Sequence, residues 1–242
     1  MSGLHVGIIM DGNGRWAQAH RKPRWRGHVA GVESVRDVVR GAPDLGITTL
    51  TLYAFSSDNW KRPRAEVSRL FWLLREYCER ERAELIENGV VVSHVGRRDR
   101  IPASACAELD RTIAATGHGQ RLHLRLAVDY SARGEIARAT AELARQVQRK
   151  RLDPTDITPE LVHRIVTRGV PDVDLIVRTA GEQRLSDFLL WESAYAEFYY
   201  TPVLWPDFRR TDLAVALSDF ETRERRFGAL TGVDAGPELA VG

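Results

Sequence analysis

The chain has 242 residues, of which 43% are hydrophobic and 28% charged, and its formal net charge is +2. This composition is ordinary for a soluble protein of one large domain, and it predicts a core that needs no disulfide or metal. The small net charge argues against nucleic-acid binding through a broad basic face. Two cysteines without CxxC spacing suit a reducing compartment. With no signal peptide and no apolar run of about 20 residues, we expect a cytoplasmic protein that is at most peripheral to a membrane.

Apolar runs and apolar helical patterns alternate along the chain. The predicted strands are Val6–Met10, Thr48–Phe55, Val90–Val95, Leu122–Val128 and Leu175–Val177, and the predicted helices are Val29–Ala42, Ala65–Glu87, Ala103–Ala115, Gly134–Lys150, a short one opening at Thr158, Phe188–Glu192 and the segment after Thr211. Such alternation predicts an α/β fold with one mostly parallel central sheet flanked by helices. We expect a single domain over residues 1–230 and a flexible tail over 231–242.

The first polar cluster, from Asp11 to Trp16, follows the first predicted strand. The glycines at 12 and 14 let backbone N–H groups turn toward an anion, and the next helix adds its positive end. Arg15 can grip a phosphate, and Asp11 can hold Mg²⁺ beside it. A simple turn capped by Asp11 would also account for these residues.

Two further clusters follow in sequence. Arg24 and His28 lie near a predicted helix start and suit a second anion site, or else a solvated basic turn. After the strand that ends at Phe55, Ser56 and Asn59 are placed to touch a ligand, and the Trp60 ring could line a cavity or shield a cation. A capped loop with a core tryptophan is the alternative interpretation.

The last clusters follow the predicted strand that ends at Val177. Arg178, Arg184 and Ser186 place two guanidinium groups and a hydroxyl on one loop, which suits a diphosphate. Glu197 is a lone acid among aromatic residues, so it needs a metal, a cation or a buried ion pair as its partner.

The order and spacing of these clusters resemble the cis-prenyltransferases, whose best-known members are the undecaprenyl diphosphate synthases. The resemblance runs from His5 to about Gly228 and is carried by HVGIIMDGNGRW (5–16), Gly27-His28, LYAFSSDNW (52–60), DLIVRT (174–179), FLLW (188–191), AYAEF (194–198) and WPDF (205–208).

The resemblance implies an undecaprenyl-diphosphate-synthase-like homodimer that condenses isopentenyl diphosphate with an allylic prenyl diphosphate and forms new cis double bonds. Asp11 and Glu197 would bind Mg²⁺, and Ser56 and Asn59 would act with Asp11 near the reacting carbons. The substrates would be held by Gly12, Asn13, Gly14, Arg15, Trp16, Arg24, His28, Trp60, Arg62, Arg178, Arg184 and Ser186, with Arg226 and Gly228 reaching in from the other subunit.

Several positions depart from the common family pattern. Ala180 stands where a Gly is usual, Asp187 and Asp129 where Asn is usual, and Glu192 where Gln is usual. These changes add acid near the expected diphosphate sites and could be neutral or could retune the substrate or product. Large residues on the long helix (Phe71, Trp72 and Tyr77), together with Val128, favour a short or medium product if they face the tunnel.

Two alternatives remain open on the sequence. The chain could be an atypical member that joins or cyclises small prenyl diphosphates. It could also be a non-catalytic partner subunit, but such proteins tend to lose the metal-binding acid or the phosphate-binding arginines. Asp11, Arg178, Arg184 and Glu197 are all present here.

Overall fold

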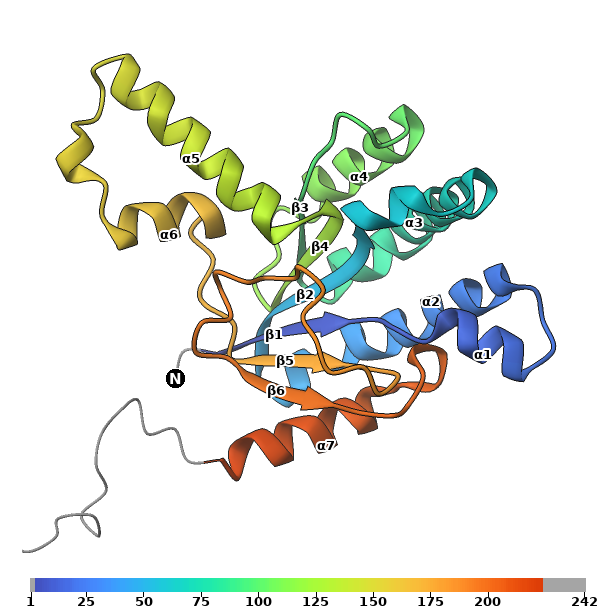
Figure 1. Cartoon of the computed structure of the whole chain (residues 1–242). Coiled ribbons are helices and arrows are strands. Elements are labelled where there is room, and N and C mark those ends of the chain that lie inside the picture. Colours follow the sequence, from blue (N-terminus) through green and yellow to red (C-terminus); the bar gives the residue numbers. More distant parts are fainter. Residues whose placement is uncertain (1–2, 224–242) are drawn as a thin grey trace, which may run out of the picture.

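The structure, a computed structural model, describes residues 3–223. One parallel sheet of six strands, in the order β3-β4-β2-β1-β5-β6, forms its centre (Figure 1). The strands are β1 (Leu4–Ile9), β2 (Ile47–Ser56), β3 (Val90–Val95), β4 (Leu122–Tyr130), β5 (Leu175–Arg178) and β6 (Glu197–Tyr200). The predicted parallel α/β sheet is therefore confirmed.

Helices connect the strands and begin where the sequence offers start signals. The α-helices are α1 (Asn13–Ala19), α2 (Arg24–Gly41), α3 (Arg64–Glu87), α4 (Ala103–Ala115), α5 (Ala132–Gln148), α6 (Pro159–Thr167) and α7 (Arg210–Glu221), with 3-10 turns η1 (Pro43–Leu45), η2 (Ser57–Lys61), η3 (Pro154–Asp156) and η4 (Trp205–Asp207). Proline precedes α2, α3 and α4 and opens α6, as is usual at helix starts.

Alternate side chains of each strand point to opposite faces of the sheet and form two cores. The larger core contains Val6 and Ile8 of β1, Leu124 and Leu126 of β4, and the facing side chains of α2, α3, α4 and α7. The smaller core, on the other face, contains Ile9. This two-sided burial explains why the strands read as continuous apolar runs.

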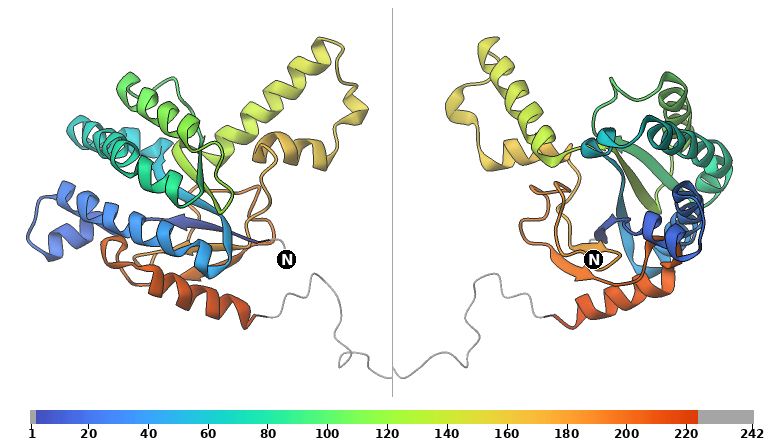
Figure 2. Two further views of the ribbon diagram at one scale, coloured as in Figure 1. Left: turned by 180° about the vertical axis from the view of Figure 1, so that it is seen from behind. Right: turned by 45° about the vertical axis from the view of Figure 1, so that its right-hand side comes forward.

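The two faces of the sheet are covered differently. In Figure 1 and both views of Figure 2, α2, α3, α4 and α7 lie on one face, whereas α5 and α6 project together as an arm. Much of the second face is covered by irregular chain, in which Phe188 and Leu189 are fully buried.

The predicted helix over Phe188–Glu192 is wrong, because this segment forms turns. Ser186, Asp187 and Leu189 have φ values of 50°, 63° and 46°, in the left-handed region that a right-handed helix cannot contain. Strand β6, whose four residues pair with β5 at the sheet edge, was not predicted from the sequence. Among residues 3–223, none of the helices combines the length and the apolar composition that a membrane span requires.

Candidate functional site

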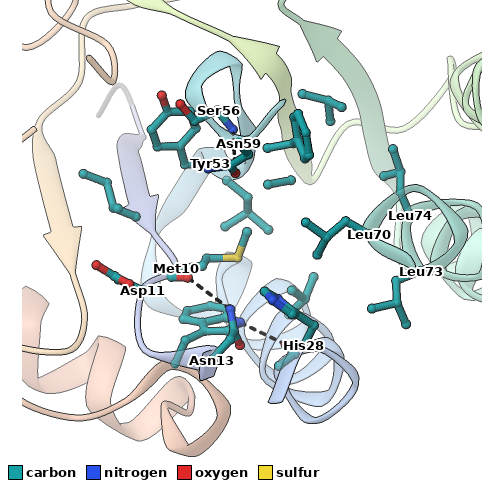
Figure 3. A pocket seen from close by; sticks show the side chains of 18 of the residues that line it. Met10, Asp11, Asn13, His28, Tyr53, Ser56, Asn59, Leu70, Leu73 and Leu74 are labelled. Atoms are coloured by element: carbon teal, nitrogen blue, oxygen red, sulfur yellow. Dashed lines mark hydrogen bonds between the residues drawn. The ribbon is translucent and has the colours of Figure 1, made fainter. Parts of the chain in front are cut away.

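A cavity of about 400 Å³ opens at the carboxyl ends of the central strands and extends between α2 and α3. Its walls differ from end to end (Figure 3). Polar groups line one end, namely Asp11, Asn13, His28, Ser56, Asn59, Arg62, Arg178 and Ser186. Apolar side chains line the other, namely Val32, Val35, Leu70, Phe71, Leu73, Leu74, Leu126 and Val128. The cavity therefore suits a molecule with an anionic head and a hydrocarbon tail.

Asp11 lies just past the end of β1 and faces Arg178 from the end of β5. The Arg178 Nη2 lies 3.0 Å from the Asp11 Oδ2, and the Gly12 N–H donates to the Asp11 Oδ1 at 2.8 Å. Gly12 has φ of +107°, which glycine adopts without strain. The Asp11 side chain is still 37% exposed, so one of its oxygens can bind a further cation.

Arg178 is almost completely buried and fixes the loop that follows β5. It donates to the Ser186 Oγ at 2.9 Å and to the Arg184 carbonyl oxygen. The Arg15 Nη1 donates to the Ala180 carbonyl oxygen at 2.8 Å, and Glu182 pairs with both Arg15 and Arg184. Three predicted anion-binding residues, Arg15, Arg178 and Arg184, therefore share this loop.

Ala180 and Asp187, two residues that differ from the common family pattern, lie in this loop and have strained backbone angles. Ala180 has φ of 70° and Asp187 has φ of 63°, a region favoured by glycine and tolerated by Asn and Asp. The usual Gly and Asn of the family suit these angles for the same reason. Asp187 accepts hydrogen bonds from the Ser131 hydroxyl and the Arg133 N–H.

A second cationic group surrounds Glu66 in the first turn of α3. One carboxylate oxygen of Glu66 lies 3.2 Å from the Arg24 Nε, 3.0 Å from the Arg62 Nη1 and 3.5 Å from the His28 Nε2. Burial alone would raise the pKa of Glu66, but the neighbouring cations outweigh it and hold the pKa below its usual value. Glu66 thus orients three predicted diphosphate-binding groups, two from α2 and one from the end of η2.

His28 is neutral at pH 7 in this arrangement. Burial, reinforced by Arg62, lowers the pKa of His28 to about 4. Its neighbour Gly27 is required by close packing, because a Cβ there would meet the Asn13 carbonyl oxygen at 1.8 Å. The Gly27-His28 motif therefore lets α2 approach the turn after β1.

Ser56 and Asn59 cap η2 reciprocally. The Asn59 Oδ1 accepts from the Ser56 N–H at 3.1 Å, and the Ser56 Oγ accepts from the Asp58 N–H at 3.1 Å. Both side chains line the cavity, and the amide NH₂ of Asn59 can donate to a molecule bound there. Figure 3 shows both residues from β2 and η2 beside Tyr53 at the cavity wall.

At the apolar end, three of the four residues expected to face the tunnel line the cavity, and one does not. Phe71, Tyr77 and Val128 line the cavity. Trp72 does not line it and is 42% exposed on the outer side of α3. Leu70, Leu73 and Leu74, visible in Figure 3, line it from the same helix and were not singled out in the sequence.

Other predicted residues lie outside the cavity lining. Trp16 donates to the Asp207 Oδ1 at 2.7 Å and stacks on His20, and Trp60 packs behind the lining against Phe55. Gly12, Gly14, Arg15, Arg24 and Arg184 lie around the polar end rather than in its wall. Arg226 and Gly228 lie outside the described residues.

Glu197 lies far from Asp11 within one chain. It pairs in register with Leu175 at the start of β5, whereas Asp11 follows Ile9, which pairs with Arg178 at the end of β5. Three residues of parallel strand, about 10 Å, therefore separate Glu197 from the level of Arg178. Glu197 instead pairs with Arg223 at 2.8 Å, and because both side chains are about one-third exposed, this is not the buried ion pair considered for Glu197.

No group of three or more His, Cys, Asp or Glu residues in the part of the chain described here could hold a metal ion by itself. Asp11 nevertheless fits Mg²⁺, which proteins commonly bind through one or two carboxylates together with substrate phosphates.

Glu66 and Tyr53 belong to the site but were not predicted from the sequence. Glu66 is the one acid in the basic stretch 61–69, at the third position of α3, and this isolation is the signal that could have identified it. The Tyr53 hydroxyl donates to the Ser186 carbonyl oxygen at 3.2 Å, and burial raises the pKa of Tyr53 to about 12. In the sequence, Tyr53 is one aromatic residue of a predicted strand, and no pattern marks it as a site residue.

Comparison with known proteins gives consistent matches over this chain. A family model described as "Putative undecaprenyl diphosphate synthase" matches residues 9–228. Isoprenyl transferase 1 of Bradyrhizobium diazoefficiens is 54% identical over 95% of this chain and 91% of its own length, and isoprenyl transferase of Brucella suis is 51% identical over 93% and 89%. The structure of lavandulyl diphosphate synthase from Lavandula x intermedia in complex with dimethylallyl diphosphate is 33% identical, covers 94% of this chain and 98% of its own, and superposes with a TM-score of 0.91.

Proposed function

This chain belongs to the undecaprenyl diphosphate synthase family and is a cis-prenyltransferase, and we propose that it joins isopentenyl diphosphate to an allylic prenyl diphosphate with Mg²⁺ bound. The family and the fold expected from the sequence motifs are both confirmed. The isoprenyl transferases at 54% and 51% identity are nearer in sequence than lavandulyl diphosphate synthase at 33%, so we prefer their activity to the atypical or non-catalytic alternatives.

The observation that carries the proposal is one cavity with two unlike ends. Cationic groups gather at its polar end around Asp11 and Glu66, and aliphatic side chains of α2 and α3 enclose the other end. A prenyl diphosphate has the same division into an anionic head and a hydrocarbon chain. Because the two ends of the cavity differ, a prenyl diphosphate can bind in one orientation only. No specific contact along its hydrocarbon chain is needed for this.

The residues suggest a division of labour at the polar end. Arg24, Arg62 and Asn13 would bind the allylic diphosphate, while Arg178, Arg184 and Ser186 would bind isopentenyl diphosphate. Preorganised cations stabilise the negative charge that develops on the leaving diphosphate. Mg²⁺ held by Asp11 would add charge neutralisation on the same leaving group.

The nucleophile in this reaction is an alkene, so the chain needs no serine or cysteine nucleophile. Ser56 and Asn59 would instead lie near the reacting carbons and help to position the two substrates. The proton lost after the carbon–carbon bond forms would go to a diphosphate oxygen.

We also propose a homodimer with a catalytic domain over residues 1–230, located in the cytoplasm. Because Asp11 and Glu197 lie apart in one chain, Glu197 could serve as a second Mg²⁺ ligand only from another copy. A lipid product would bring peripheral membrane contact. The segment 15–26 suits an anionic lipid surface, since it holds four arginines and one lysine and no acid.

We propose that the apolar end of the cavity determines the length of the product. Phe71, Tyr77 and Val128 reduce the room there, which favours a short or medium chain.

The proposal is tested by incubating the purified protein with Mg²⁺, labelled isopentenyl diphosphate and, in separate reactions, dimethylallyl, geranyl or farnesyl diphosphate. Chromatography of the dephosphorylated products would give the chain length and double-bond geometry. We expect elongated products with cis double bonds that disappear when EDTA is added. Failure to incorporate isopentenyl units with any starter, by a folded protein, would overturn the proposal.

A further inference from the structure

Asp129, at the end of β4, is a completely buried carboxylate in strained backbone. Its side chain is 0% exposed, and its φ is 50°. A buried charge is tolerated only when it is paired and hydrogen-bonded. The Arg100 Nε donates to the Asp129 Oδ2 at 2.9 Å, the Arg100 Nη2 donates to Oδ1, and the Ser57 hydroxyl also donates to Oδ1 at 3.0 Å.

The loop after β3 is shaped to bring Arg100 to this carboxylate. Gly96 has φ of +122°, and a Cβ on it would meet the Val128 carbonyl oxygen at 2.2 Å. Only glycine therefore allows this close approach to the end of β4. The Arg97 N–H then donates to the Asp129 carbonyl oxygen at 3.0 Å, which fixes the loop from a second point.

Arg100 contacts a second partner on its other side. Its guanidinium carbon lies 5.2 Å from the centroid of the Trp60 ring, within the range of a cation–π interaction. Trp60 in turn contacts Phe55 and Phe71, with ring centroids 5.3 Å apart in each case. Arg100 thus joins a buried carboxylate of β4 to an aromatic cluster in which Phe55 and Phe71 line the cavity.

Both contacts of the Arg100–Asp129 pair end on η2. Ser57 is its first residue and Trp60 its fourth, and between them lies Asn59, which faces the cavity. The back of η2 is therefore held at two points, and its front carries Ser56 and Asn59. The pairing with Arg100 also compensates the negative charge of Asp129. The Asp that replaces the usual Asn of the family at this position therefore adds no net charge beside the diphosphate groups.

We propose that Arg100 and Asp129 are positioning residues for the reaction, because they hold η2 so that Ser56 and Asn59 point at the reacting carbons. This inference rests on the proposed prenyl transfer. Neither residue lines the cavity, so their loss should affect turnover far more than substrate binding.

The test uses Arg100→Met, Arg100→Lys and the double variant Arg100→Met with Asp129→Asn. Arg100→Met leaves a buried carboxylate unpaired and could fail to fold, whereas the double variant removes that charge. We expect kcat of the double variant to fall by roughly tenfold to a hundredfold while KM for isopentenyl diphosphate changes by less than about twofold. Arg100→Lys keeps the charge but not the forked geometry, so it should recover part of kcat.

The matched control is Arg98→Met. Arg98 lies in the same loop but pairs with exposed Asp110, away from η2. This variant should keep native kcat and KM. A double variant with native kcat, or an equal loss in Arg98→Met, would overturn the inference.

A readout without substrate separates this inference from the proposed function. In substrate-free protein, the backbone amides of residues 57–61 should exchange hydrogen about tenfold faster in the double variant than in the native chain or in Arg98→Met. Unchanged exchange would refute the anchoring of η2 even if turnover fell. If the native chain made no product, the proposed function would fail, and the exchange result would still decide whether Arg100 and Asp129 hold η2.

Discussion

The two ends of the cavity are built in different ways. At the polar end each functional group is held by another, as Asp11 is by Arg178, Arg62 by Glu66 and Asn59 by the Ser56 backbone. At the apolar end, Leu70, Leu73 and Leu74 contribute only size and shape. Hydrogen bonds and ion pairs need exact partners, whereas aliphatic packing tolerates exchange at similar volume.

This difference assigns a separate property to each end. The polar end should decide whether bond formation occurs, because charge develops there. The apolar end should decide how far the product grows, because the chain ends against it. Substitutions at one end should therefore leave the property of the other end unchanged.

The largest expected effect is at Asp11. Asp11→Ala should lower kcat by roughly a thousandfold, because it removes the group proposed to hold Mg²⁺ at the leaving diphosphate. Binding of the allylic diphosphate, measured by calorimetry, should largely persist through Arg24 and Arg62. Asp44→Ala is the control, since Asp44 pairs with Arg121 on the surface. Normal turnover in Asp11→Ala would refute the metal role.

The polar end should also make stability depend on pH. The pKa of His28 is about 4 in the folded chain and 6.5 when unfolded, so the unfolded chain binds more protons in this window. The stability that neutral His28 contributes is therefore complete above pH 6.5 and is lost as the pH falls toward 4, by about 2–3 kcal/mol.

Urea unfolding at pH 7, 5.5 and 4 measures this effect. His28→Gln should weaken the fall in the free energy of unfolding across this window, and substitution of exposed His118 by Gln should not. An identical pH dependence in native protein and His28→Gln would contradict the burial argument.

A smaller effect is expected at Glu66. Glu66→Gln keeps the size of the side chain but removes the charge that orients Arg24, Arg62 and His28. We expect KM for the allylic diphosphate to rise by roughly tenfold, with product length unchanged. Glu79→Gln, on the exposed side of the same helix, controls for loss of an acid on α3. A change of product length in Glu66→Gln alone would break the division between the two ends.

The smallest effect on rate, and the clearest on product, is expected at Phe71. Phe71→Leu enlarges the apolar end and should lengthen the main product by one or more isoprene units, while kcat for the first addition changes by less than about threefold. Trp72→Leu is its matched control, because Trp72 is the next residue but faces away from the cavity. Chromatography of the products measures both. Equal lengthening in the two variants would show that cavity space is not the cause.

The sequence predicted the fold well where local patterns were long. The strands Val90–Val95 and Leu122–Tyr130 and the helices α3 and α4 match the predicted ranges within two residues at each end. It failed where tertiary packing decides the backbone. The residues 188–192 have helical composition, but left-handed angles at Asp187 and Leu189 let Phe188 and Leu189 turn into the second core. Strand β6 has only four residues, and its pairing with β5 is not a local property.

Clustering at the carboxyl ends of parallel strands predicted that Asp11, Ser56 and Arg178 line one site, and the structure brings them together. Sequence spacing could not reveal which element supplies a partner. Glu66 is only four residues from Arg62, but the fold is needed to bring it beside Arg24 and His28. The fold likewise brings Arg100, in a loop outside the motifs, beside Asp129. Composition likewise could not show that Trp72 faces outward while Phe71 faces the cavity.

The most direct test of the account is a crystal structure of the protein with Mg²⁺ and a non-hydrolysable analogue of geranyl diphosphate. We predict that the diphosphate lies within hydrogen-bonding distance of Arg62 and Asn13, with Mg²⁺ on Asp11, and that the hydrocarbon chain extends between α2 and α3 toward Leu74 and Phe71. A diphosphate bound elsewhere, or a chain directed away from this gap, would contradict the assignment of the two ends.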